Sequence, residues 1–344
     1  MKLGLIMGTG SGAGIQIDMD LIREAEDLGF DTVWTSEAWG SDAISTASWV
    51  LAQTSKIKVG TGIIQMSART PAMAAMTAMT LQQLSGDRFI LGIGPSGPQV
   101  IEGWHGEAYG RPLTRTREYI EIIRKIEARD GPLTYDGFHY QIPKTGAGTT
   151  GLGKPLKGIL HSVSPLKIVT GTIAPAGVRV SAEIADGMIP VFMNPDRFDV
   201  FEDALNDGFA KAGGGKSLDN FTITPFCGVN LNDDEDAARQ PARENLGLYI
   251  GGMGARDKNF YNDYAKRLGH EAAAVEIQDH FLSGRRAEAL AAVPNELIDQ
   301  VALTGPAGKI TERLQEWKAS GKVDSLLARC NTSAELNVLA KAVL

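Results

Sequence analysis

The chain has 344 residues, of which 43% are hydrophobic and 22% charged, proportions that exclude a disordered chain and a coiled coil. Its net charge is −7 and no long basic run occurs, so we expect no binding of nucleic acid. Glycine accounts for 40 residues, which is typical of a fold with many tight strand-to-helix turns.

Short apolar runs alternate along the chain with stretches of helical periodicity, and glycine or proline often separates the two. The pattern predicts, in chain order, strand 3–7, helix 18–28, strand 32–36, helix 42–54, strand 58–64, helix 71–84, strand 89–94, helix 114–129, strand 167–173, helix 178–185, strand 188–192, helix 195–212, strand 221–231, helix 309–319, strand 323–330 and a last helix from Ser333.

Strands that alternate with helices favour a parallel sheet, and a count of eight favours an α/β fold of the (β/α)8 TIM-barrel type. We expect a single domain over residues 1–344. The alternative is an open doubly wound sheet with a Gly-x-Gly-x-x-Gly turn after the first strand. Gly8 and Gly10 begin such a turn, but Ala13 stands where the third glycine belongs.

Two stretches do not fit the eightfold alternation and are predicted to be insertions. Residues 130–166 contain a predicted hairpin at 135–140, with Asp136-Gly137 at its turn. Residues 232–305 follow the seventh strand, at the carboxyl end of the barrel, where the active sites of such barrels are built. This larger insertion is therefore a candidate lid or pocket wall.

The sequence holds no recognisable metal site. Cys227 and Cys330 lie far apart, which favours two buried free thiols in a reducing compartment. None of the five histidines has metal-ligand spacing with another, and His105 is the one expected in a loop facing the pocket. No window approaches the ~18 apolar residues of a membrane helix, and the pattern at the amino end leads us to expect no signal peptide. We therefore expect a cytoplasmic protein that binds no membrane.

Three blocks of sequence carry a resemblance to a known family. They are TGIIQM with RTP at 61–71, LSGDRFILGIGPSGPQV with EGWHG at 84–106, and EIADGMIP at 183–190. Together they resemble the bacterial luciferase-like superfamily, and within it the branch that uses the deazaflavin coenzyme F420. The resemblance covers nearly the whole chain, and SGPQV together with EGWHG is its most specific part.

The resemblance implies an oxidoreductase that transfers a hydride between C5 of the deazaflavin and a small organic substrate. It also implies a non-proline cis peptide at Gly62-Ile63, behind the coenzyme ring. The sequence alone also allows an ordinary glycine bend there, and turn chemistry alone in the other loops. The residues implied to bind the coenzyme are Gly62, Ile63, Gln65, Ser96, Gly97, Pro98, Gln99, Gly171, Thr172 and Ala174.

The chain departs from the sugar-phosphate dehydrogenases of this branch, which have Asp followed by a catalytic His after the second strand. Here the residues are Glu37-Ala38-Trp39, and Pro98 stands where those enzymes have a glutamate. These departures argue against sugar-phosphate oxidation and favour a reductase. The alternatives are an FMN-dependent luciferase-like monooxygenase and a non-catalytic coenzyme-binding protein.

Glu37 and His105 are the candidate catalytic residues. Glu37 ranks first as a pocket carboxyl that positions substrate or relays a proton, because a strand end is rigid. His105 ranks second as a proton donor, and a water molecule is the alternative. Met73, Met76 and Met79 recur on the third helix, either as a core face or as the surface through which members of the family pair. We expect a homodimer.

Overall fold

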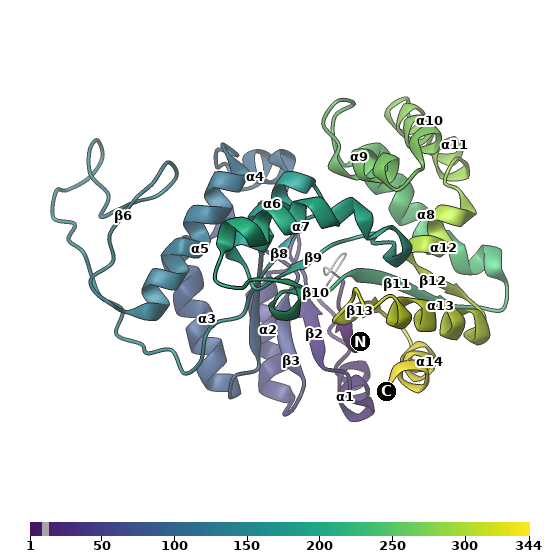
Figure 1. Cartoon of the computed structure of the whole chain (residues 1–344), viewed down its shortest axis with the longest axis horizontal. Coiled ribbons are helices and arrows are strands. Elements are labelled where there is room, and N and C mark those ends of the chain that lie inside the picture. The colour runs from purple at the N-terminus through teal and green to yellow at the C-terminus, as the bar shows by residue number, and fades with distance from the viewer. Residues whose placement is uncertain (9–13) are drawn as a thin grey trace.

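The computed structural model describes residues 1–8 and 14–344. Thr9, Gly10 and Ala13 of the predicted glycine-rich turn lie outside the described residues. Parallel strands and helices alternate along the chain as predicted, and Figure 1 shows the strands at the centre with helices outside them. Within the described ranges, no helix is both long and apolar enough to cross a membrane.

The strands close into a barrel with the order expected of a TIM fold. Each is paired in parallel with its chain neighbour, and the last strand is paired with the first. In chain order, the strands are β1 (Lys2–Ile6), β2 (Thr32–Thr35), β3 (Lys58–Thr61) with β4 (Ile64–Gln65), β5 (Phe89–Gly94), β8 (Ile168–Gly171), β9 (Gly187–Ile189), β10 (Thr222–Ile223) with β11 (Phe226–Leu231), and β13 (Ser325–Arg329).

The ring closes through its seventh strand, which has two parts. The first part, β10, pairs with β9, and the second part, β11, pairs with β13. Pro225 lies between them and cannot donate a backbone hydrogen bond, which accounts for the break in a strand predicted to be continuous. A parallel bridge between Val191 and Phe226 continues the contact with β9. The open-sheet alternative is therefore wrong.

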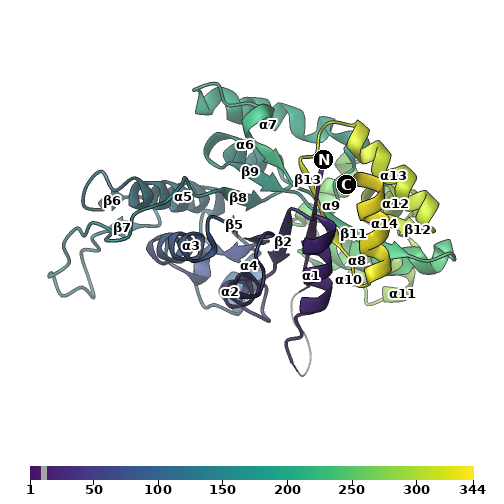
Figure 2. The same cartoon turned by 90° about the horizontal axis from the view of Figure 1, so that it is seen from below.

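The helices form a ring around the strands, as the view in Figure 2 shows. Several predicted starts are confirmed by their caps: Asp42 accepts the Ser45 N–H at 2.6 Å, and Thr70 accepts the N–H of Met73 ahead of a helix with Pro71 in its first turn. The ring consists of α1 (Met19–Leu28), α2 (Ala43–Gln53), α3 (Pro71–Ser85), α5 (Pro112–Ala128), α6 (Pro175–Ile184), α7 (Asp199–Ala212), α13 (Ala307–Ala319) and α14 (Ser333–Val343).

Both predicted insertions are present. The first carries a two-stranded antiparallel hairpin, β6 (Tyr135–Asp136) and β7 (Gln141–Ile142), and its loops project from the barrel beside α5 (Figure 1). The second contains α8 (Glu235–Gly252), α9 (Phe260–Arg267), α10 (Glu271–Leu282), α11 (Arg286–Ala291) and α12 (Asn295–Val301). It ends in a short strand that the sequence analysis missed, β12 (Leu303–Gly305), which pairs with the far end of β11.

Two further predictions of local structure were wrong. The stretch after β5 was expected to be a loop, but it forms a short helix, α4 (Pro98–Gly103). The three methionines of α3 do not share one face: Met79 is buried in the core, whereas Met73 and Met76 are 53% and 59% exposed. A spacing of three residues drifts around a helix that has 3.6 residues per turn, so Met79 turns inward.

The third strand leaves its regular pairing just before the carboxyl end of the barrel. Gly60 pairs with Ile90, and the pairing resumes with Ile64 opposite Ile93, so one strand carries an extra residue. The hydroxyl of Thr61 takes the place of the lost backbone bonds: it accepts the Gly92 N–H at 2.9 Å and donates to the Gly92 carbonyl at 2.8 Å. This bulge interrupts the strand that was predicted to run from 58 to 64.

Gly92 is the residue that makes this bulge possible. A β-carbon there would lie 1.7 Å from the carbonyl oxygen of Thr61. We therefore expect Gly92→Ala to destabilise the protein by at least ~2 kcal/mol, because the backbone of the bulge has to move. Urea unfolding measures this change. Gly131→Ala is the control, since a β-carbon on Gly131 meets nothing within 4 Å. Equal stability of the two variants would contradict the account of the bulge.

Candidate active site

The interior of the barrel is filled by an apolar layer below its carboxyl end. The layer includes a tryptophan and branched aliphatic side chains from six of the strands, and it forms a cluster separate from the main core between strands and helices. Its members are Ile6, Trp34, Ile90, Val169, Ile189 and Leu327, with Ile63 and Phe226 packed against them. The barrel is thus closed below its mouth, and a ligand at the mouth would meet an apolar floor.

Glycines surround Ile63 immediately above this layer. A β-carbon on Gly94 would lie 2.8 Å from Cδ1 of Ile63, and one on Gly171 would lie 3.2 Å from its Cγ2. The peptide between Gly62 and Ile63 is cis, as the resemblance implied. Ile63 is half-buried, so part of its side chain faces the mouth. The absence of side chains on its neighbours leaves a shallow apolar seat.

Gln65 lies beside this seat and is almost fully buried, at 1% exposed. Its amide nitrogen donates to the carbonyl of Ala38 at 3.1 Å and lies 3.4 Å from the hydroxyl of Ser96. Its amide oxygen is 2.5 Å from Nε2 of His105. An acceptor at that distance directs the His105 N–H toward Gln65. Gln65 therefore joins three of the loops at the mouth and orients the imidazole.

Glu37 is held by an arginine that the sequence analysis did not consider. Arg69 donates to both carboxylate oxygens of Glu37 at 2.8 Å, and the side chains are 18% and 8% exposed. The Glu37 carboxylate also accepts the backbone N–H groups of Gln65 at 3.0 Å and Ala43 at 3.2 Å. With four donors around it, the carboxylate has little capacity left for a substrate.

Asp42 completes this charged cluster by pairing with the same guanidinium. Burial favours the neutral form of Asp42, but hydrogen bonds from Ser45 and the charge of Arg69 outweigh it and hold the Asp42 pKa below its usual range. Burial also opposes the charge of Arg69, yet the bond to Glu37 and both carboxylates raise its pKa. The cluster ties the loop after β2 to the loop after β4.

The segment Ser96–Gln99 forms the next part of the rim. Ser96 has φ 57°, a left-handed backbone that costs a non-glycine residue about 1–2 kcal/mol. Its carbonyl accepts the hydroxyl of Tyr109 at 3.2 Å, which fixes the loop. Gly97 precedes α4, and both it and Pro98 are half-buried at the mouth, whereas Gln99 is exposed.

The segment Gly171–Ala174 follows β8 and leads into α6. Gly171, Thr172 and Ala174 are all half-buried. Arg267, at the end of α9, donates to the carbonyl of Ile173 at 2.9 Å and brings a positive charge beside this segment. The structure thus brings this segment and the bulge together around Ile63, since Gly171 faces its side chain.

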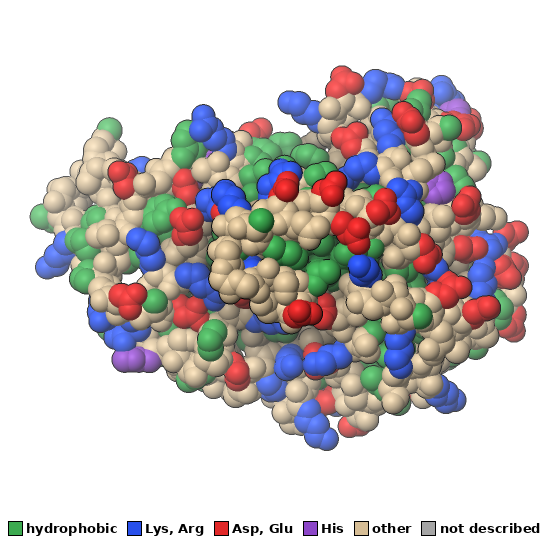
Figure 3. Space-filling model, in the orientation of Figure 1, with side chains coloured by type: hydrophobic (Ala, Val, Ile, Leu, Met, Phe, Trp, Pro, Cys, Tyr) green, Lys and Arg blue, Asp and Glu red, His purple; other side chains and the backbone are tan. Residues whose placement is uncertain are grey.

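Aromatic side chains from the larger insertion form a wall at the mouth. Tyr249 of α8 and Tyr261 of α9 stand edge to face at 4.7 Å between ring centroids, and Phe192 packs against Tyr249 at 5.4 Å. In Figure 3, apolar side chains gather between α4 and the helices of the insertion. The insertion therefore lies beside the mouth, and we keep it as a candidate wall of the pocket. Trp39 and Trp104, in contrast, are 58% and 65% exposed.

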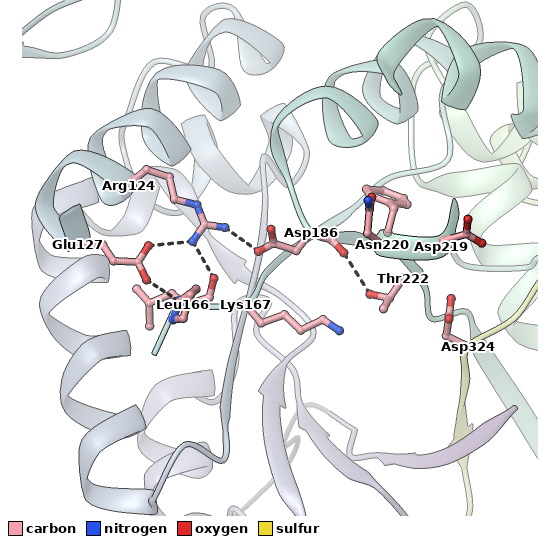
Figure 4. A pocket seen from close by; sticks show the side chains of 11 residues that line it. Arg124, Glu127, Leu166, Lys167, Asp186, Asp219, Asn220, Thr222 and Asp324 are labelled. Carbon is pink, nitrogen blue, oxygen red and sulfur yellow. Dashed lines mark hydrogen bonds and ion pairs between the residues drawn. The ribbon is translucent and has the colours of Figure 1, made fainter. Parts of the chain in front are cut away.

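A hollow of about 610 Å³ lies at the opposite, amino end of the strands. Figure 4 shows Arg124 there between Glu127 and Asp186, with bonds of 2.9 and 2.6 Å, so these charges neutralise one another. Among the described residues, no group of three or more potential ligands is arranged to hold a metal ion. The polar groups that converge on an open apolar seat lie at the carboxyl end, and we place the candidate site there.

The comparison with known proteins agrees with this architecture. Residues 5–323 match the model of a family described as luciferase-like monooxygenase. The chain belongs to the luciferase-like monooxygenase family. A provisionally named coenzyme F420-dependent oxidoreductase from Mycobacterium tuberculosis is 42% identical over 344 residues, which cover 100% of this chain and 99% of the relative.

Two other members of this group are more distant. A 5,10-methylenetetrahydromethanopterin reductase from Archaeoglobus fulgidus is 28% identical over 303 residues, covering 87% of this chain and 85% of the relative. The solved coenzyme F420-dependent tetrahydromethanopterin reductase from Methanopyrus kandleri superposes with a TM-score of 0.77 at 23% identity, covering 99% and 98% of the two chains. This likeness supports the TIM-barrel fold described above for this chain.

Several residues at the mouth of the barrel were not singled out by the sequence analysis. Arg69 appeared only within the RTP motif, although a charged residue shortly after a barrel strand indicates a candidate site residue. Tyr109 and Tyr261 lie far from any strand in sequence, and only the folded insertion brings the tyrosine of α9 to the mouth. No pattern in the sequence indicates that contact.

The ion pair between Glu37 and Arg69 provides a test of the charged cluster that these residues form with Asp42. Glu37→Gln should leave the guanidinium of Arg69 partly buried with one fewer carboxylate, at a cost of ~3 kcal/mol in the free energy of unfolding. Because folding lowers the pKa of Asp42, its contribution is present above pH ~4 and lost as the pH falls below that value. Unfolding by urea at pH 7 and at pH 3 measures both effects.

The control for this substitution is Asp20→Asn, which removes an exposed carboxylate that pairs with Arg23. It should leave stability almost unchanged, because exposed ion pairs contribute little. If Glu37→Gln is as stable as this control but loses turnover, Glu37 acts on the substrate, as first ranked, and not on the loops.

Proposed function

We propose that this protein is a coenzyme F420-dependent oxidoreductase that transfers a hydride between the deazaflavin and a small organic substrate, working as a reductase. The observation that carries the proposal is the apolar seat at the barrel mouth, where Ile63 is bordered by Gly94 and Gly171. A β-carbon at either glycine would press on Ile63 and displace it from the position in which it would support a flat ring. The names of the relatives support the same coenzyme.

Each segment around the proposed seat would have its own role in binding the coenzyme. Ile63 would lie under the ring, with Gly62 and Gln65 beside it. Ser96, Gly97, Pro98 and Gln99 would border the ring edge and the start of its tail. Backbone amides at Gly171, Thr172 and Ala174 suit the anionic tail, and the charge of Arg267 beside them adds to that attraction. When bound, the reduced coenzyme supplies a hydride from its C5.

The protein's own contribution to the reaction is to hold the ring, exclude water and move a proton. We propose His105 as the residue that protonates the substrate or stabilises its charge, because its imidazole is half-buried and oriented by Gln65. Glu37 then serves as a positioning residue, since Arg69 and two backbone amides already occupy its carboxylate. This reverses the ranking made from sequence.

A second candidate is an FMN-dependent luciferase-like monooxygenase, which the description of the matched family favours. It would use reduced FMN and oxygen in the same seat. Turnover separates the two functions: reduced coenzyme F420 is mixed without oxygen with a panel of compounds that have activated C=N or C=C bonds, and reduced FMN is tested with oxygen in parallel. Reoxidation of F420 in step with substrate loss is expected. Turnover with FMN alone would support the monooxygenase, and binding without turnover would indicate a carrier.

His105→Gln tests the proposed proton donor. We expect kcat to fall ~10- to 1,000-fold with coenzyme affinity within about tenfold of the parent, because the seat is left intact. His280→Gln is the matched control, since His280 lies on α10 and contacts Arg285. A variant of His105 with full turnover would show that water or another group supplies the proton.

We further propose that two copies pair through α3, where Met73 and Met76 expose apolar surface on neighbouring turns. Met76→Asp should convert the dimer into a monomer in sedimentation equilibrium, whereas Leu152→Asp, on the exposed loop after β7, should not. A parent protein that sediments as a monomer would exclude this pairing.

The two cysteines are free and buried, which supports a reducing, cytoplasmic location.

A further inference from the structure

Arg329 is the last residue of β13, at the carboxyl end of the barrel. Side chains alternate along a strand, and Leu327, two residues earlier, belongs to the apolar layer inside the barrel. Arg329 therefore points toward the barrel axis above that layer, and its side chain is exposed at the mouth. An inward position at this end of a TIM strand is where such barrels place site residues.

The guanidinium of Arg329 has no acidic partner in the described part of the chain. Within residues 1–8 and 14–344, no hydrogen bond or ion pair joins the Arg329 guanidinium to another residue. Residues 9–13, which follow β1, are Thr-Gly-Ser-Gly-Ala and bring no carboxylate. The first acid after it along the chain, Glu335, accepts the backbone N–H groups of Leu231 at 3.2 Å and Asn331 at 2.7 Å. Arg329 therefore keeps its charge and its donors for another group.

Open space lies beside this charge. Gly228 of β11 is the register partner of Arg329, and a β-carbon on it would meet nothing within 4 Å. On the other side, a β-carbon on Gly8 would lie 3.1 Å from Nη2 of Arg329. Burial raises the pKa of Tyr249, and the charge of Arg329 opposes that rise, so the two groups lie within electrostatic reach. The guanidinium thus lies beside a gap and within electrostatic reach of the aromatic wall.

The location of Arg329 separates it from the proposed coenzyme contacts. Those contacts lie in the bulge between β3 and β4, on β4 and β8, and in the segments that follow β5 and β8, whereas β13 lies across the barrel between β11 and β1. From β5, the ring of strands reaches β13 after four steps in either direction. A group bound by Arg329 would therefore belong to the second reactant and not to the coenzyme tail.

Resting on the proposed function, we propose that Arg329 is a specificity-determining residue that binds an anionic oxygen group, a carboxylate or a phosphate, on the substrate. The planar guanidinium suits both groups because it can donate two parallel hydrogen bonds. Gly228 leaves the room that the group needs, and the aromatic wall covers the apolar part of the molecule. Neutral analogues that lack the anion leave Arg329 without its partner and bind more weakly.

Fluorine NMR provides a test that does not depend on turnover. Line broadening of 4-fluorobenzoate and of the neutral 4-fluorobenzamide is measured with the whole protein, alone and saturated with oxidised coenzyme F420. The variants are Arg329→Gln and Arg329→Lys. The control is Arg286→Gln, which removes the same charge from α11, where the guanidinium lies over Phe281. Inorganic phosphate is added as a competitor.

We expect the benzoate to bind at least ~10-fold more tightly than the amide, and this preference should vanish in Arg329→Gln and persist in Arg286→Gln. Arg329→Lys should retain part of it. Displacement by phosphate assigns the site to phosphate as well, and failure to displace assigns it to carboxylates. Equal binding of benzoate and amide, or a preference that survives Arg329→Gln, overturns the inference. If the parent protein prefers the benzoate but does not bind coenzyme F420, the proposed function is overturned and the inference about Arg329 is not.

Discussion

The mouth of this barrel depends on the packing of one residue, Ile63, where the third strand carries an extra residue. Thr61 replaces the lost backbone bonds with its hydroxyl, and Gly92 admits the displaced carbonyl. Ile63 then projects over the apolar layer, and Gly94 and Gly171 make room for it. Gln65 follows Ile63 by two residues, and its side chain contacts His105, so the bulge also affects the position of that imidazole.

Charge at the mouth is arranged in two ways. Glu37, Asp42 and Arg69 satisfy one another, so they fix loops and have little capacity left for a ligand. Arg329 has no such partner among the described residues and faces open space next to Gly228. A closed cluster beside the proposed ring and an unpaired charge across the barrel would divide the mouth into a coenzyme half and a substrate half.

The alternation of strands and helices was predictable because each strand is buried and each helix presents a repeating apolar face. The bulge was predictable only through the resemblance to a family, since TGIIQ reads as an uninterrupted strand. The strand at Leu303–Gly305 was missed because short pairings depend on the partner strand and not on their own composition. Pro225, in contrast, was a signal in the sequence for the break in the seventh strand, and it was overlooked. The role assigned to Glu37 changed because Arg69 reaches it across two loops, a contact that spacing does not reveal.

The most direct test of the central claim is the affinity of the protein for coenzyme F420 when the seat is altered. Quenching of the coenzyme's fluorescence is titrated with the parent protein, with Ile63→Ala and with Ile159→Ala, a matched change at an isoleucine that is 95% exposed on the smaller insertion. Loss of apolar contact should weaken binding by about 1–2 kcal/mol in Ile63→Ala alone. Unchanged affinity of Ile63→Ala, with the parent binding the coenzyme, would show that the ring does not lie on Ile63.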